Sequence, residues 1–145
     1  MMCRKYLILL FIAFLFSTCK KDNNEDLFVI SILSTAPVEL QEFKENISVS
    51  IQYVHPEGYV GFFDPDYLSL EVKDSRLSNP DYYHLIPVSP PNETISVQGK
   101  LLLEIDAPFV FGNGLAETLT YTIRIQDKDK AWSNKVTTSL ITVNK

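Results

Sequence analysis

Apolar and polar residues alternate strictly in two segments of this chain, at residues 47–53 and 119–126. Successive side chains of a β-strand point to opposite faces, so a period of two places one set against a core and the other in water. An α-helix needs a period of 3.6. After Cys19 no useful stretch has that period, apart from a weak turn-like segment at 38–45. The pattern therefore predicts half-buried antiparallel strands.

Shorter versions of the same alternation bring the expected number of strands to about seven. They occur at 28–33, 68–72, 82–88, 100–105 and 136–143. The segments between them are rich in proline, glycine and asparagine, and these residues end strands because proline removes a ladder donor and glycine accepts positive φ. About seven short strands in roughly 100 residues predict an all-β, antiparallel two-sheet sandwich of immunoglobulin or fibronectin type III kind. The Cys–Trp–Cys pattern of antibody domains is absent from the sequence.

The N-terminus has the features of an export signal. Arg4 and Lys5 precede an apolar run at 6–16, and small residues stand directly before Cys19. A basic start, an apolar stretch of roughly 7–15 residues and small residues before a cleavage point are typical of a secretory signal peptide. The run is too short for an ordinary membrane span of about 20 residues. We therefore expect a signal peptide at 1–18 and a mature chain that begins at Cys19.

The residues before Cys19 resemble the lipobox of bacterial lipoproteins. In Leu15-Phe16-Ser17-Thr18-Cys19, phenylalanine and threonine stand where the usual lipobox has leucine and then glycine or alanine. Relaxed lipoboxes followed by Lys-Lys-Asp look like those of Bacteroidota-type lipoproteins. The resemblance implies that the Cys19 thiol carries a diacylglycerol, with acyl chains such as palmitate, and that lipid holds the chain in the outer membrane. The alternative is a plain secretory peptide with an incidental cysteine.

An acidic stretch follows the cysteine and leads into the domain. We interpret residues 19–26 as the lipidated cysteine with an acidic tether, and residues 27–145 as one β-sandwich domain of ordinary size. The stretch at 22–26 is similar to the signal that exports such lipoproteins to the outer face of the outer membrane. It is equally suited to be a solvated tether, so surface display and a periplasmic location both stay open.

Charge and cysteine content exclude several classes of partner. Removal of the signal changes the formal net charge from −5 to −7, because Arg4 and Lys5 are lost with it. A net-acidic chain without a basic cluster argues against nucleic acid and against electrostatic attachment to anionic lipid. Lipidation of Cys19 leaves no thiol, since Cys3 lies inside the signal. Disulfides then contribute nothing, and hydrophobic burial must stabilise the fold.

Four short motifs stand at 53–61, 74–76, 99–101 and 127–134. They read Tyr-Val-His-Pro-Glu-Gly-Tyr-Val-Gly, Asp-Ser-Arg, Gly-Lys-Leu and Asp-Lys-Asp-Lys-Ala-Trp-Ser-Asn. They resemble the Tyr-x-Asp-x-Asp-Gly-Asp-x-Gly loop, the Asp-Ser-Arg strand end, the Gly-led strand and the Asp-x-x-x-Asn-x-Ser-Asn hairpin of small single-domain Bacteroidota-type lipoproteins. Ala131 replaces the first asparagine of the hairpin. The resemblance covers nearly the whole mature domain and implies no particular activity.

The first motif departs from the family pattern in its acids. That pattern has three aspartates and looks like a calcium loop, whereas here His55 and Tyr59 replace the first and third, and Glu57 is the remaining acid. A hard cation needs about 6–8 oxygen ligands at ~2.3–2.6 Å, which one carboxylate cannot supply. We expect neither a metal nor a cofactor. Four other acids could rebuild a site, although turn formation is their ordinary role. They are Asp64, Asp66, Asp74 and Asp127.

The sequence contains no recognisable catalytic set. His55 precedes a proline and is expected at the surface of a turn. Ser75 has neither a Gly-x-Ser-x-Gly elbow nor an implied base. Glycosidase carboxylates face each other across a cleft at roughly 5–9.5 Å, whereas Asp64 and Asp66 share one proline-containing turn. We therefore expect that the protein is not an enzyme.

Aromatic residues in the expected loops are the candidate contact residues for a partner or a glycan. They are Tyr59, Phe62, Phe63, Tyr67, Phe109, Phe111 and Trp132. Such rings anchor protein interfaces or stack on sugars, and they also plug the ends of sandwiches as ordinary core. We expect a lipid-anchored, non-catalytic domain that binds or scaffolds another protein at the outer membrane or cell surface. The alternative is a glycan-binding surface module that uses these aromatic rings.

Overall fold

The computed structural model describes residues 28–56, 58, 60–87 and 96–145, and over these residues the chain is all-β. One antiparallel sheet has the order β1-β3-β6 and consists of β1 (Val29–Ala36), β3 (Ile47–His55) and β6 (Val97–Ile105). A second antiparallel sheet has the order β5-β4-β8-β9 and consists of β5 (Asp81–His84), β4 (Leu68–Asp74), β8 (Tyr121–Ile125) and β9 (Val136–Thr137).

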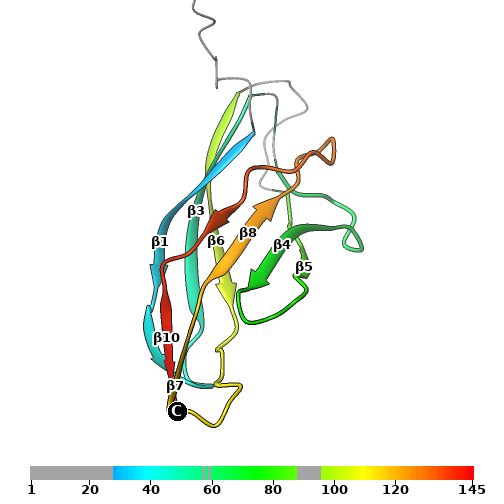
Figure 1. The fold of residues 1–145 in the computed structure, drawn as a ribbon. Helices are drawn as coiled ribbons and strands as arrows, with labels where there is room; N and C mark the ends of the chain where they lie inside the picture. Colours follow the sequence, from blue (N-terminus) through cyan, green and yellow to red (C-terminus); the bar gives the residue numbers. More distant parts are fainter. Residues whose placement is uncertain (1–27, 57, 59, 88–95) are drawn as a thin grey trace, which may run out of the picture.

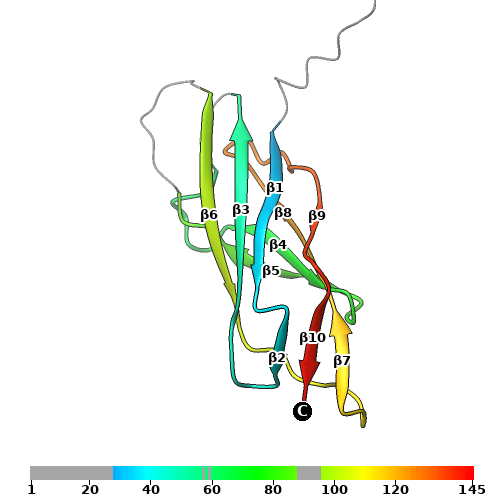
Figure 2. The same ribbon diagram turned by 90° about the vertical axis from the view of Figure 1, so that its left-hand side faces the viewer.

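A third, smaller sheet pairs a strand from the early part of the described chain with the last strand. Its strands are β2 (Glu39–Gln41), β10 (Ile141–Asn144) and β7 (Ala116–Leu119), with β2 parallel and β7 antiparallel to β10. Figure 1 shows the elements along the chain, and Figure 2 shows β1, β3 and β6 as one layer with β4, β5 and β8 behind it. This all-β arrangement of mainly antiparallel sheets is compatible with a β-sandwich.

The core confirms the alternation that the sequence predicts. Along β3 the buried and partly exposed residues alternate from Ile47 to His55, and along β8 they alternate from Tyr121 to Ile125. Burying one Val, Leu, Ile or Phe side chain stabilises a fold by about 1.5–3 kcal/mol, so these two strands account for much of the core. On β6, a Cβ at Gly99 would overlap the ring of Tyr53, its partner in the β3 ladder. The Gly-led strand therefore needs glycine at that position.

All seven predicted segments contain strands, but two of them are divided. Thr120 separates β7 from β8, and residues 138–140 separate β9 from β10, so that each segment contributes to two sheets. Where the chain passes from one sheet to the other, side chains take the place of strand partners. The Thr138 hydroxyl accepts a hydrogen bond from the Tyr121 N–H, and the Ser75 hydroxyl accepts one from the Thr120 N–H. Leu119 and Tyr121 both stay buried, so the sequence alternation continues through the break and does not reveal it.

The other differences from the prediction are local. The turn expected at 38–45 begins with the short strand β2, and the predicted strand at 82–88 contributes only β5, with residue 88 outside the described range. The signal peptide, Cys19 and the tether also lie outside the described residues. Among the residues that are described, none forms a helix with the length and apolar character needed to cross a membrane.

Candidate functional site: an aromatic surface supported by Arg76

Three of the seven predicted aromatic residues lie together near the 127–134 hairpin, and they are held by polar contacts. The ring centres of Phe62 and Tyr67 lie 4.2 Å apart, and the Tyr67 hydroxyl donates a hydrogen bond of 2.8 Å to the side-chain oxygen of Gln126. The guanidinium of Arg124 lies 4.2 Å from the centre of the Trp132 ring. Phe62, Tyr67 and Trp132 are half-buried and serve the packing of this region.

The remaining predicted aromatics have different outcomes. Phe63, next to Phe62 in the chain, is 81% exposed. Tyr59 lies outside the described residues. Phe109 and Phe111 lie in the segment between β6 and β7, away from the hairpin, and they join a different group of rings.

This second group consists of Phe43, Phe109 and Phe111, which we call the aromatic surface. Phe43 stacks on Phe109 with 5.2 Å between ring centres and 10° between ring planes, and Phe111 meets Phe109 edge-on at 4.9 Å. The three side chains are 66%, 44% and 45% exposed, respectively. They therefore form one row of rings that contact each other and also face solvent.

Phe43 was not among the predicted site residues. It lies in the turn after β2 and has a φ of 61°, a left-handed conformation that is unusual for a bulky residue. Its N–H donates a hydrogen bond of 3.2 Å to the carbonyl of Pro108, which ties the turn to the segment that carries Phe109. The sequence gives no periodic signal for this turn, and the contact joins residues more than sixty positions apart.

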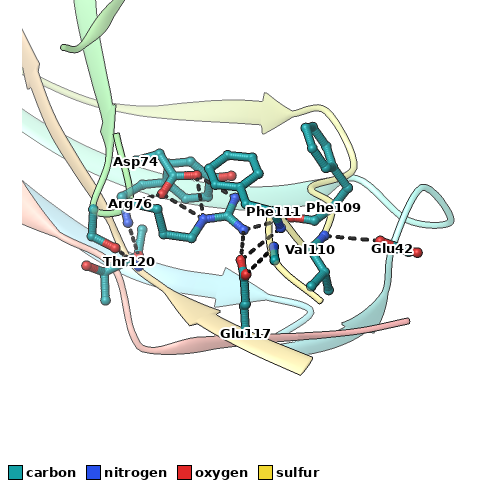
Figure 3. Close-up of polar contacts among 12 residues, drawn as sticks. Glu42, Asp74, Arg76, Phe109, Val110, Phe111, Glu117 and Thr120 are labelled. Atoms are coloured by element: carbon teal, nitrogen blue, oxygen red, sulfur yellow. Dashed lines mark hydrogen bonds and ion pairs between the residues drawn. The ribbon is translucent and has the colours of Figure 1, made fainter. Parts of the chain in front are cut away.

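Arg76 supports the aromatic surface from beneath (Figure 3). Its Nε and Nη2 donate to the two carboxylate oxygens of Asp74 at 3.1 and 2.7 Å, and its Nη1 donates to the Phe109 carbonyl at 2.7 Å and to Glu117 at 3.1 Å. The guanidinium carbon lies 4.0 Å from the centre of the Phe111 ring. Arg76 therefore joins the end of β4, the ring-bearing segment and β7.

Burial on its own would lower the pKa of Arg76, but the hydrogen bonds and charge of Asp74, together with Glu117, outweigh it and raise this pKa. The Arg76 and Asp74 side chains are 13% and 8% exposed, so their bidentate contact is shielded from water and is stronger than a surface ion pair. The contact gives the Asp-Ser-Arg motif a structural role at this end of the molecule.

Two carboxylates hold the backbone of the segment that carries the rings. Glu117 accepts hydrogen bonds from the N–H groups of Phe111 and Gly112 at 3.1 and 2.7 Å, and Glu42 accepts one from Val110 at 3.1 Å. These N–H groups, followed by Arg76, keep the pKa of Glu117 below its ordinary value. Segments outside a ladder must find other partners for their N–H groups, and here acidic side chains supply them.

A cavity of about 580 Å³ lies next to the aromatic surface, between β5 and β6. Phe109 and Phe111 line it together with inward-facing residues of β4 and β6. Tyr83 of β5 also lines the cavity, and burial, followed by the charges of Asp81 and Asp106, raises the pKa of this tyrosine. Acidic groups thus stand beside an apolar space that opens between two edge strands.

The candidate metal ligands are engaged in turns and ion pairs. Asp64 accepts a hydrogen bond from the N–H of Asp66 at 3.0 Å, and Asp74 is bound by Arg76. One carboxylate oxygen of Asp127 accepts the N–H groups at positions 129 and 131, each at 2.8 Å. Across the described residues there is no group of three or more His, Cys, Asp or Glu side chains that could hold a metal ion.

The expectation that His55 lies at the surface is wrong. His55 is 4% exposed, its Nε2 lies 3.1 Å from Asp127 Oδ2, and its ring lies 5.0 Å from that of Phe28. The reason is its position in β3, because the alternation that begins at Ile47 places residue 55 on the inward-facing side. His55 therefore joins the 53–61 motif to the 127–134 hairpin.

No protein-family model, characterised protein or solved structure was found to match this chain. The residues and their geometry therefore have to indicate the function.

Proposed function

We propose that this chain is a lipid-anchored, non-catalytic β-sandwich protein that binds another protein at the outer membrane or cell surface through its aromatic surface. The lipid anchor is proposed from the resemblance of the sequence before Cys19 to a lipobox. The contact is proposed from the row formed by Phe43, Phe109 and Phe111, and this row is the single observation that carries the proposal.

The strand order supports a sandwich of the immunoglobulin or fibronectin type III kind. Strands β1, β3 and β6 share one layer, β4, β5 and β8 share the other, and β2 pairs in parallel with the last strand, β10. Neighbours in a sheet are thus mostly not consecutive in the chain, as expected where connections cross between two sheets. A fold of this kind presents loops at both ends, and the aromatic surface lies at one of them.

The rings have the properties of a preformed protein contact. Aromatic residues and arginine are enriched at interfaces and among the residues that contribute most to binding. Each ring touches another. Arg76 donates a hydrogen bond to the backbone that carries two of the rings, and Glu117 and Glu42 accept hydrogen bonds from it, so this backbone is fixed. A partner would therefore bury rings that are already ordered, which reduces the entropic cost of association.

The position of the aromatic surface suits an anchored protein. In Figure 1 the start of β1 lies at the upper end, whereas the yellow segment between β6 and β7 lies at the lower end, near the C-terminus. If lipid holds the N-terminus, the aromatic surface lies at the end of the domain opposite the anchored end of the chain. It would then be available to another protein of the envelope or to the extracellular side.

Ring packing favours a protein partner over the glycan alternative. A sugar stacks on the open face of an aromatic ring, but one face of Phe111 is covered by Arg76 and Phe109 is stacked on Phe43. Edges and partly covered faces suit the irregular contacts of a protein surface better. Phe43 is the most exposed ring of the row, so its loss should weaken either kind of binding most directly.

The test is co-purification from detergent-solubilised membranes of cells that produce the full chain. We expect a membrane protein to co-purify in stoichiometric amount with the unchanged chain and with the control Phe63→Ala, which removes an exposed ring outside the aromatic surface. Phe43→Ala and Phe109→Ala should each reduce its recovery at least about tenfold, as expected for an important interface residue. Equal recovery with all four chains, or glycan-array binding that Phe43→Ala abolishes, would contradict the proposal.

A further inference from the structure

The strand β6 is a long sheet edge. It has nine residues and pairs with β3 along its whole length, and within the described residues it has no second neighbour. An exposed edge of this length presents a row of backbone N–H and C=O groups that can pair with another strand. Leu102, one residue past its centre, is 64% exposed, and its partner across the ladder is Ser50. Among the described residues, the monomer thus leaves a leucine in solvent near the middle of a sheet edge that has no second strand.

The sequence of β6 is complementary to itself about Leu102. Lys100 and Glu104 stand two residues before and after it, and both are exposed on the same face as Leu102 because the side chains of β6 alternate between two faces. Neither charge has an ion-pair partner among the described residues. Leu101 and Leu103 point to the other face and line the cavity, which Leu102 and Glu104 also border because it lies along this edge.

We propose that two copies of this chain associate through β6, in antiparallel register centred on Leu102. In that register Lys100 of each copy faces Glu104 of the other, and the two Leu102 side chains face each other on the symmetry axis. Cross-strand pairs of opposite charge and of apolar residues stabilise a sheet, and the two-fold axis makes the Lys100–Glu104 pair occur twice. The two sheets become one, in the order β1-β3-β6-β6-β3-β1.

The same pairing covers the open side of the cavity. Antiparallel addition places Leu103 of the second copy opposite Leu101, on the face of the sheet that lines the cavity between β5 and β6. A one-residue shift of register would move every side chain to the wrong face, and a two-residue shift would lose the Lys100–Glu104 match. The proposal goes beyond the aromatic surface, which takes no part in it.

Charge reversal tests both the interface and its register. Lys100→Glu places glutamates opposite one another, Glu104→Lys does the same with lysines, and each should weaken the dimer of the full chain in detergent at least about tenfold. Sedimentation equilibrium of the unchanged chain should show a dimer, and the double variant Lys100→Glu/Glu104→Lys should restore it. Mixing the two single variants should give a heterodimer, because all four charges are then paired with opposite ones.

The outcomes separate this interface from others. Monomers of the unchanged chain at the highest attainable concentration overturn the proposal. A dimer that neither single reversal weakens, or two weakened single variants that fail to associate on mixing, also overturns it. Binding of β6 to an extended segment of another protein would appear as a monomeric purified chain whose partner is lost with both reversals.

Cysteine crosslinking gives a second, independent measurement. Leu102→Cys places two thiols at directly opposite positions, where Cα atoms of paired strands lie about 4.5–5.5 Å apart and a disulfide can form. Lys100→Cys places the two thiols four residues apart along the strands, so it should crosslink much less under the same mild oxidation. The unchanged chain controls for Cys3 and Cys19. Equal crosslinking of Leu102→Cys and Lys100→Cys would contradict the register.

Discussion

Two regions of the molecule contain the same kinds of polar contact but differ in how far their aromatic rings are exposed. In the hairpin region, Asp127 accepts two backbone N–H groups, and the cations of Lys130 and Arg124 lie over aromatic rings. In the aromatic surface, Glu117 accepts two backbone N–H groups and Arg76 lies over Phe111. The two sets of contacts are the same in kind, so they cannot by themselves indicate function.

Burial separates the two regions. Asp127 is 5% exposed and packs against the buried His55, and the rings held near it are half-buried. Glu117 and Arg76 instead support rings that are exposed by 44% or more. The hairpin region therefore closes one part of the fold, whereas the aromatic surface is held in place but left open. An exposed, ordered apolar surface is typical of an interaction site.

The largest difference between the regions should appear when each carboxylate is removed. Asp127→Ala leaves the N–H groups at 129 and 131 without their acceptor and removes the buried contact between Asp127 and His55, so we expect it to lower the free energy of unfolding by about 3–4 kcal/mol. Urea unfolding of the full chain measures this. Asp129→Ala is the matched control, since it removes an exposed acid of the same turn, and should cost less than about 0.5 kcal/mol. Equal losses for both variants would show that the buried contact of Asp127 contributes no more to the free energy of unfolding than the exposed acid does.

The next effect concerns Arg76. Arg76→Lys keeps the charge but loses the fork that binds Asp74 at two oxygens, so we expect a loss of about 2 kcal/mol in unfolding free energy. Recovery of the proposed partner should fall with it, because the Phe109 carbonyl also loses its donor. Arg124→Lys is the matched control in the hairpin region, where a single guanidinium nitrogen contacts Glu71. It should leave partner recovery unchanged, and an equal fall in both variants would contradict the distinction between the regions.

The sequence predicted the strands better than the aromatic surface because strand faces follow local periodicity. The alternation in β3 gave its buried residues correctly, and its continuation to residue 55 should have indicated the buried His55. Phe109 and Phe111 were selected as loop aromatics, but their contact with Phe43 depends on a turn near position 43 that meets a segment more than sixty residues later. No local pattern contains that meeting.

The division of two predicted strands has a similar cause. Thr120 interrupts pairing without interrupting the alternation, because burial on both sides of it stays in phase while the sheet partner changes from β10 to β4. Periodicity reports which face is buried and carries no information about which strand lies alongside. The lipid anchor at Cys19 and the protein partner stay predictions, since they depend on parts of the chain or on molecules that the described fold does not include.

A smaller effect, of opposite sign, is expected at Phe43. Its φ of 61° is strained for phenylalanine and acceptable for glycine, so Phe43→Gly should raise the free energy of unfolding by about 0.5–1 kcal/mol. The same substitution removes the outermost ring and should abolish recovery of the partner. A gain in stability with a loss of binding is the expected mark of a residue kept for function. A loss of stability above 1 kcal/mol would instead make Phe43 part of the core.

The smallest effect is the pH dependence of the aromatic surface. The N–H groups of Phe111 and Gly112, and then Arg76, lower the pKa of Glu117 below its ordinary value of 4.5. A carboxyl whose pKa is lowered by folding stabilises the fold fully above its unfolded pKa, and this contribution is lost as the pH falls through the folded pKa. The surface should therefore loosen only below pH 4.5. The amide signal of Gly112 in NMR spectra of the full chain should titrate with a midpoint below 4.5, and Glu117→Gln should remove that titration. A midpoint at or above 4.5 would mean that the two N–H groups do not hold the carboxylate, and the aromatic surface would lose the support that distinguishes it from an ordinary loop.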